Sequence, residues 1–297
     1  SEMCIRDRAG AHVINGFGKS IGLVQVQELG TLETPILLTN TLSVGTVSTA
    51  LVEYMLERND DIGLDAGTVN SLVMECNDAR LSDIRGLHVT KEHARAALAA
   101  ASETFAEGDV GAGAGMVCYS LKGGIGSASR LCHLYGETYT VGALVMTNFG
   151  TLRDLRVAGD PVGERLFWQE QSELKDKGSI IVIIATDVPL SARQLERVAK
   201  RAQSGIARTG GISGNGSGEI ALAFTTGNKL AHYSSDRLES IRLVYEEDID
   251  EVFRAAIESV DEAIISSMLH AKAVTGRAGN HYKSLADLYM PEKKSEK

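Results

Sequence analysis

The chain has 297 residues, of which 43% are hydrophobic and 23% are charged, and its formal net charge at pH 7 is −9. This balance is typical of a globular protein with a sizeable core, and the acidic charge argues against a nucleic-acid-binding protein, which needs clustered Lys and Arg. No apolar run is long enough to span a membrane and residues 1–20 lack the pattern of a signal peptide, so we expect a soluble, cytoplasmic protein with no membrane partner.

The first half of the chain alternates patterns of strands and helices. "SEMCIRDR" (1–8) has no periodicity. "IGLVQVQEL" (21–29) alternates apolar and polar residues and predicts a half-buried strand. "TVSTALVEYMLER" (46–58) has apolar residues at helical spacing, and the Ala- and Glu-rich segment 90–108 predicts a second helix that ends on Gly108.

The second half continues the alternation. Two short β-branched segments, 139–148 and 178–187, predict buried strands. Ser191 and Gln194 have the spacing of a capping box that starts a helix. The later predicted elements are strands 219–226 and 238–246, an amphipathic helix over roughly 248–273 and a frayed tail, 291–297. With no linker and no repeat, the pattern predicts one compact domain of layered sheets and helices.

Several short motifs imitate cofactor or metal sites without matching them. "VINGFGKS" has Val13 where a phosphate-binding loop needs glycine. "GAGAG" (111–115) lacks the G-x-G-x-x-G spacing of a dinucleotide-binding loop. "HVTKEH" (88–93) does not have zinc-helix spacing. The cysteines (Cys4, Cys76, Cys118, Cys132) are widely spaced, which predicts reduced, mostly buried thiols. We therefore expect no cofactor and no metal.

Glycines surround one serine, Ser217, just before the predicted strand 219–226: they are Gly211, Gly214, Gly216 and Gly218. A serine hydroxyl needs an adjacent base to act as a nucleophile. If the Gly216–Ser217 bond were cut, the new α-amino group would be a base on the same residue, with a pKa of about 7.7–8.0. The glycines would then allow the strained turn that self-cleavage requires. On glycine content alone, a flexible hairpin turn is the commoner interpretation.

Eight blocks of sequence bear on these alternatives. They are "NGFGKSIGLVQVQELG", "TPILLTNTLSVGTV", "ECNDARLSDIRG", "GAGAGMVCYSLKGGIGSASR", "YTVGALVMTNFG", "ATDVPLSARQLERVAKRA", "RTGGISGNGSGEIALAF" and "ESVDEAI". In this order they resemble the DmpA-type family of L-aminopeptidase/D-esterases and β-peptidyl aminopeptidases, which mature by autoproteolysis to an N-terminal nucleophile. The resemblance implies an α/β fold, a four-layer α-β-β-α sandwich shared with the ornithine acetyltransferases.

The resemblance also implies the cut and its products. Ser217 resembles the family's nucleophile and Gly216 the residue before the cut, so one domain over 1–297 would be divided into 1–216 and 217–297. The family's N-terminal part usually begins some tens of residues upstream of "AGAHVINGFGKS", and we expect that part to be missing here. The implied partners are a small peptide or an aminoacyl amide or ester, and further copies of the chain, as a tetramer of cleaved pairs.

Supporting residues follow from the same resemblance. Tyr119 resembles a phenol near the family's oxyanion, and Asn148 is an amide that could donate there. A serine and a carboxylate two residues apart in a late helix match Ser259 and Asp261, with Glu262 as an alternative carboxylate. Glu75 to Asp78 ("ECND") either line the pocket or cap a loop.

Two other functions remain open at this stage. An acyltransferase of the ornithine acetyltransferase type would share the architecture and the self-cleavage, but those enzymes use a threonine where this chain has Ser217. A non-catalytic binding protein would keep the glycine loop uncut.

Overall fold

A computed structural model describes residues 5–64, 67–170, 178–231, 238 and 240–289. Its main sheet has six strands in the order β2-β1-β10-β9-β8-β7. β9 and β10 are parallel, and the other neighbours are antiparallel. The strands are β1 (Ile5–Gly16), β2 (Thr31–Leu32), β7 (Gly124–Leu134), β8 (Glu137–Asn148), β9 (Ser179–Thr186) and β10 (Gly218–Ala231). The central strands read as continuous apolar runs because both faces of this sheet are covered.

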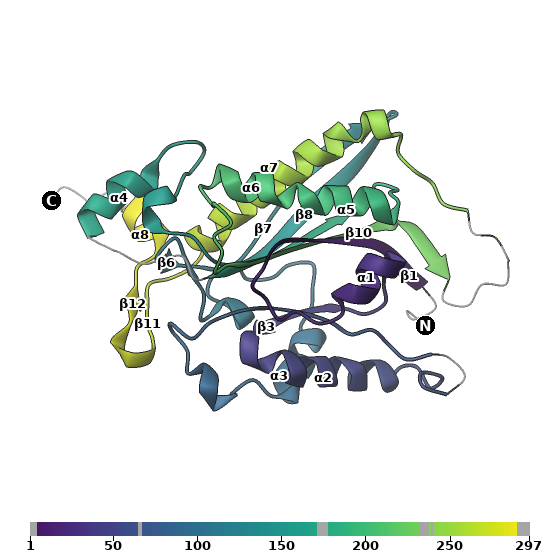
Figure 1. Ribbon diagram of the computed structural model, residues 1–297, viewed down its shortest axis with the longest axis horizontal. Coiled ribbons are helices and arrows are strands. Elements are labelled where there is room, and N and C mark those ends of the chain that lie inside the picture. Colours follow the sequence, from purple (N-terminus) through teal and green to yellow (C-terminus); the bar gives the residue numbers. More distant parts are fainter. Residues whose placement is uncertain (1–4, 65–66, 171–177, 232–237, 239, 290–297) are drawn as a thin grey trace.

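A second, two-stranded parallel sheet packs against the first. It consists of β3 (Ile36–Asn40) and β4 (Leu72–Cys76). Helices α5 (Ala192–Lys200), α6 (Ala202–Arg208) and α7 (Asp250–Leu269) cover the far face of the large sheet, and α2 (Val44–Leu56) and α3 (Lys91–Ala99) cover the far face of the small one (Figure 1). The four-layer α-β-β-α sandwich implied by the resemblance is confirmed.

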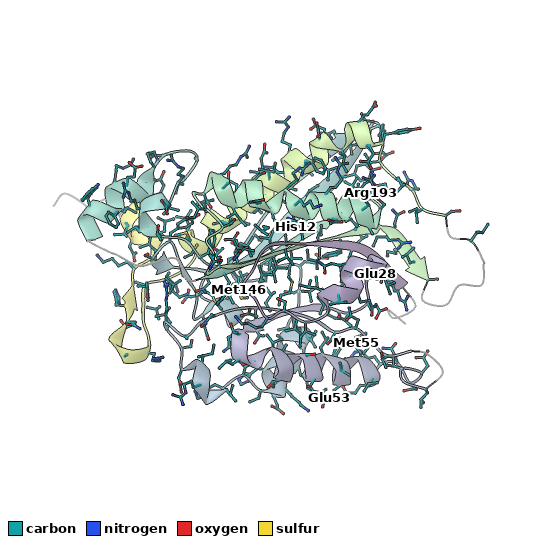
Figure 2. The ribbon with its side chains drawn as sticks, viewed as in Figure 1. His12, Glu28, Glu53, Met55, Met146 and Arg193 are labelled. Atoms are coloured by element: carbon teal, nitrogen blue, oxygen red, sulfur yellow. The ribbon has the colours of Figure 1, made fainter. Side chains whose placement is uncertain are left out.

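Three apolar clusters fill the spaces between the layers. One joins the large sheet to α5, α6 and α7. The second lies between the two sheets and includes Met146, and the third lies between the small sheet and α2 and includes Met55 (Figure 2). The apolar face predicted for the last helix is buried along α7, from Val252 to Met268. Burial of these clusters is the main stabilising contribution to the sandwich.

Shorter elements connect the layers. The helices are α1 (Leu23–Leu29), α4 (Val162–Glu170) and α8 (Leu285–Tyr289), and the strands are β5 (Val117–Cys118), β6 (Leu121–Lys122), β11 (Val274–Thr275) and β12 (His281–Tyr282). The 3₁₀ turns are Thr41–Ser43, Ile84–Gly86, Gly111–Gly113, Leu152–Asp154, Glu246–Asp248 and Arg277–Gly279. Among the described residues, Cys76, Cys118 and Cys132 are buried free thiols, as expected, whereas Cys4 lies outside this part.

Most predicted elements are confirmed, namely 46–58, 139–148, 178–187, 219–226, 248–273 and the capping box of Ser191 with Gln194. The strand predicted at 21–29 is wrong. Gly22 (φ 93°) and Gly30 (φ 66°) turn the chain out of the sheet, and helix α1 between them buries only Val26. Its alternating pattern therefore does not reflect a sheet face.

Two further predicted elements differ from the structure. The helix predicted to reach Gly108 ends at Ala99, because residues 99–106 are exposed and Gly108 instead exchanges hydrogen bonds with Ile125 of β7. Within the strand predicted at 238–246, residues 240–245 form no strand, because β1 and β9 already pair with both edges of β10. The side chain of Asn228 instead binds the backbone of Arg242. The sequence patterns also missed β1 and β7, and the tail 291–297 lies outside the described residues.

Candidate active site

Ser217 lies immediately before β10, at the centre of the large sheet, and its side chain is fully buried. Its N–H donates to the Gly214 carbonyl (2.9 Å), which closes a tight turn over residues 214–217. The next residue, Gly218, lies so close to the backbone of Phe17 that a Cβ would stand 2.6 Å from the Phe17 carbonyl oxygen. Glycine is therefore required beside the serine for close packing.

Asn15, near the end of β1, holds this turn from the neighbouring strand. Its side-chain amide nitrogen lies 3.2 Å from the carbonyl oxygens of both Gly214 and Asn215, and it also donates to the carbonyl of Ser217. One amide thus binds three carbonyls around the Gly216–Ser217 bond. These contacts tie the turn to β1.

A carboxylate that the sequence analysis missed contacts the serine directly. The Ser217 hydroxyl donates to Oε1 of Glu219 (2.9 Å), and the Ser213 hydroxyl donates to Oε2 (2.6 Å). Glu219 is fully buried. Residues two apart on a strand face the same side, so the Ser-x-Glu spacing at the start of a predicted strand was the available signal.

Non-glycine residues with left-handed backbone occur in the loop before Ser217 and in the hairpin between β5 and β6. Tyr119 (φ 49°) and Ser120 (φ 60°) form the two-residue turn between β5 and β6, and Ser213 has φ 52°. A hairpin turn with two positive φ angles normally takes Asn-Gly, so this Tyr-Ser pair is strained. Such strain is found preferentially at functional sites.

Tyr119 is buried and connected to the start of the glycine-rich loop. Its hydroxyl lies 2.8 Å from Oγ1 of Thr209, and Thr209 donates its own proton to the Ile206 carbonyl (2.8 Å). The phenol is therefore the donor to Thr209. The ring packs edge-on against Phe149 with centroids 5.0 Å apart.

Asn148 does not contact Ser217. Its amide accepts from the Val117 N–H (2.9 Å) and donates to the Asn77 carbonyl (2.9 Å). In the sheet it lies opposite Ser179, which in turn lies opposite Gly218. Two strand spacings separate Asn148 from the start of β10 by about 10 Å. This amide links β8 to the ends of β4 and β5.

Ser259 and Asp261 are not brought to the nucleophile either, and this expectation is corrected. Ser259 is buried and donates to the Val141 carbonyl (3.0 Å). Val141 and Asn148 are seven residues apart on β8, which separates them by about 23 Å along the strand. Asp261 lies 3.9 Å from Arg208, and burial raises the pKa of its carboxyl. The alternative, Glu262, pairs with Arg130. Because α7 crosses the sheet, Ser259 lies over the end of β8 opposite to Asn148.

The "ECND" segment divides between two places. Glu75 is buried and accepts from the Lys19 N–H (2.8 Å) and the Thr41 hydroxyl. A Cβ built on Gly18 would lie 3.6 Å from Oε1 of Glu75 and 3.9 Å from Cα of Gly218, so Glu75 borders the start of β10.

Asp78 instead lines a cavity of about 440 Å³ between β3, α3 and the "GAGAG" loop. His88 and His93 line it as well, and Ser217 does not. His93 and Thr90 form the capping box of α3, in agreement with a polar helix start. Within the described residues, no cluster of three or more His, Cys, Asp or Glu side chains could hold a metal ion, and no helix is long and apolar enough to cross a membrane.

The α-β-β-α sandwich with a buried serine directly before a central strand agrees with the Ntn hydrolase fold. The chain belongs to peptidase family S58, which it matches over residues 3–282. It is 39% identical over 286 residues to the β-peptidyl aminopeptidase BapA of Sphingosinicella microcystinivorans, covering 91% of this chain and 71% of the relative.

Solved structures agree with this family. The PH0078 protein of Pyrococcus horikoshii OT3 is 51% identical, with a TM-score of 0.92 over 97% of this chain and 80% of that one. The L-aminopeptidase D-Ala-esterase/amidase of Ochrobactrum anthropi, described as a prototype of the serine aminopeptidases and a variant of the Ntn hydrolase fold, is 36% identical with a TM-score of 0.89 over 96% and 79%. The protein is a peptide hydrolase of the aminopeptidase class.

Proposed function

We propose that Ser217 is the nucleophile of an autoproteolytically activated serine aminopeptidase. The chain would cut its own Gly216–Ser217 bond, giving residues 1–216 and 217–297, and then release N-terminal residues from small peptides, amides or esters through an acyl-enzyme on Ser217. The observation that carries this proposal is the fully buried Ser217 in a tight glycine turn at the head of the central strand β10.

Cleavage would supply the base for turnover. In the uncut chain the Ser217 nitrogen is an amide whose N–H donates to Gly214. After the cut it becomes an α-amine on the same residue as the hydroxyl, with an unperturbed pKa of about 7.7–8.0, close to the value that favours general-base catalysis at neutral pH. A serine in this role, and not a threonine, also favours the peptidase over the related acyltransferases.

The first prediction concerns the products of processing. Active protein should run as two fragments on a denaturing gel, and the smaller should begin at Ser217 when its N-terminus is sequenced. An uncut binding protein would give one band. Peptidase activity, measured with aminoacyl p-nitroanilides, in a preparation whose intact mass shows only the full-length chain would contradict the proposal.

Tyr119 is proposed to assist turnover by donating to the oxyanion. Its hydroxyl binds Thr209, the C-cap of α6 and the residue at which the loop to Ser217 begins. Tyr119→Phe should lower kcat by about 10²–10³-fold and leave the fold intact. An unchanged kcat in the cleaved variant would assign Tyr119 to packing alone.

Cleaved pairs are proposed to assemble into homo-oligomers, as tetramers by family resemblance. Light scattering on the processed protein would measure this, and a monomeric cleaved pair would contradict it. The cytoplasmic location remains a prediction from the sequence.

A further inference from the structure

We propose that Glu219 is the base for the self-cleavage step itself. This inference rests on the proposed function, because it concerns the uncut chain that precedes the active enzyme. Oε1 of Glu219 accepts the Ser217 hydroxyl proton at 2.9 Å, within the 2.6–3.2 Å reach of a general base. Ser217 directly precedes β10 and Glu219 is the second residue of that strand, so the start of β10 brings the two side chains together.

The uncut chain needs a base other than the one that serves turnover. An amide nitrogen has no basic lone pair, so the α-amino group of Ser217 cannot assist the first cut. Glu219 is the group that the geometry places on the hydroxyl at that stage. The chain would therefore use two bases in succession: a carboxylate before the cut and an amine after it.

The carboxylate is held in position from both sides. Its second oxygen accepts from Ser213 (2.6 Å), which belongs to the same glycine loop and has a left-handed backbone. The Glu219 backbone is paired with Asn15 of β1 and with Ile180 of β9. Asn15 also binds the turn that contains the scissile bond. Base, nucleophile and scissile peptide thus share one rigid frame, as efficient proton transfer requires.

Self-cleavage would proceed by an N-to-O acyl shift and then by hydrolysis of the resulting ester. Glu219 takes the proton of the Ser217 hydroxyl while Oγ forms a bond to the carbonyl carbon of Gly216. The C–N bond then breaks, and the proton passes from the Glu219 carboxyl to the leaving nitrogen, which becomes the α-amine. Water hydrolyses the resulting Gly216–Oγ ester, leaving a Gly216 carboxylate, the free Ser217 hydroxyl and an ammonium group.

The test follows cleavage of freshly refolded full-length precursor on a denaturing gel. Glu219→Gln should slow the appearance of the 217–297 fragment by at least about 10²-fold, the low end for loss of a general base. Glu137→Gln, the same substitution at an exposed position of β8, is the matched control and should be cut at the wild-type rate. A folded Glu219→Gln precursor that is cut at the wild-type rate overturns the inference.

Two additions separate catalysis from folding. The thermal unfolding of each variant is compared with that of uncut Ser217→Ala. If Glu219→Gln does not fold, Glu219→Asp replaces it, because aspartate keeps the charge but shortens the reach. Glu219→Asp should be cut more than tenfold slower than wild type, and a wild-type rate would contradict the role of Glu219. Hydroxylamine cleaves esters, so it should not restore cutting of Glu219→Gln. Restoration would place Glu219 after the acyl shift and overturn its role as the base. A wild-type precursor that is never cut at Gly216–Ser217 would instead refute the proposed function.

Discussion

Replacing Ser217 by alanine should leave the protein as one uncut polypeptide and lower its peptidase activity by about 10⁴-fold or more. The hydroxyl that attacks the Gly216 carbonyl and the hydroxyl that forms the acyl-enzyme are the same group, so a single deletion removes both reactions. The buried hydroxyl makes one hydrogen bond, to Glu219, and the fold should survive its loss. Intact mass and hydrolysis of an aminoacyl p-nitroanilide measure the two effects.

Two comparisons sharpen this result. Ser129→Ala removes a serine hydroxyl from an exposed position of β7 and should still be cut and active, which controls for the loss of a serine elsewhere in the chain. Ser217→Cys keeps a nucleophile and should retain self-cleavage with slow turnover, because the site is shaped around an oxygen. A Ser217→Ala protein with wild-type activity would remove Ser217 from the mechanism.

Lys122→Met should lower the free energy of unfolding by about 1–3 kcal/mol, the cost of leaving buried acceptors unsatisfied. Lys122 is fully buried in β6, and its Nζ donates to the carbonyls of Gly113 (2.9 Å), Met116 (3.0 Å) and Gly123 (2.7 Å). Methionine would leave these carbonyls without that donor. The substitution should also loosen the β5–β6 hairpin that carries Tyr119. Urea unfolding in the uncut Ser217→Ala background keeps the measurement to one chain.

The same lysine should give a pH signature. Burial lowers the pKa of Lys122 to about 8, so between pH 8 and its ordinary value near 10.5 the unfolded chain binds more protons. The protein that has Lys122 should therefore gain stability with rising pH over this interval relative to Lys122→Met. Lys200→Met, at a half-exposed position paired with Glu196, is the control and should change stability by less than about 1 kcal/mol at any pH. Equal effects of both substitutions would contradict the role assigned to the buried amine.

Only those parts of the candidate site that depend on neighbouring residues in the chain could be predicted from the sequence. The glycines around Ser217 and the apolar strand that follows are local features, and both are found where the sequence places them. The Ser-x-Glu spacing of Ser217 and Glu219 is equally local, but by itself it does not distinguish a carboxylate that binds the serine from one that faces solvent. Asn148, by contrast, appeared available from its strand-end position, and only the packing of two sheets shows that Val117 and Asn77 occupy its amide.

By itself, the sequence determined the alternation of strands and helices, the family and the position of the buried serine, because these depend on periodicity, turn chemistry and motif order along the chain. Only the tertiary structure decided which side chains meet. The crossing of α7 over β8 places Ser259 far from Ser217, and the left-handed glycines beside α1 convert an apparent strand into a helix. The register of β1 against β10 brings Asn15 to the turn before Ser217, from about two hundred residues away in the chain. Such contacts arise from long-range packing, which no local pattern encodes.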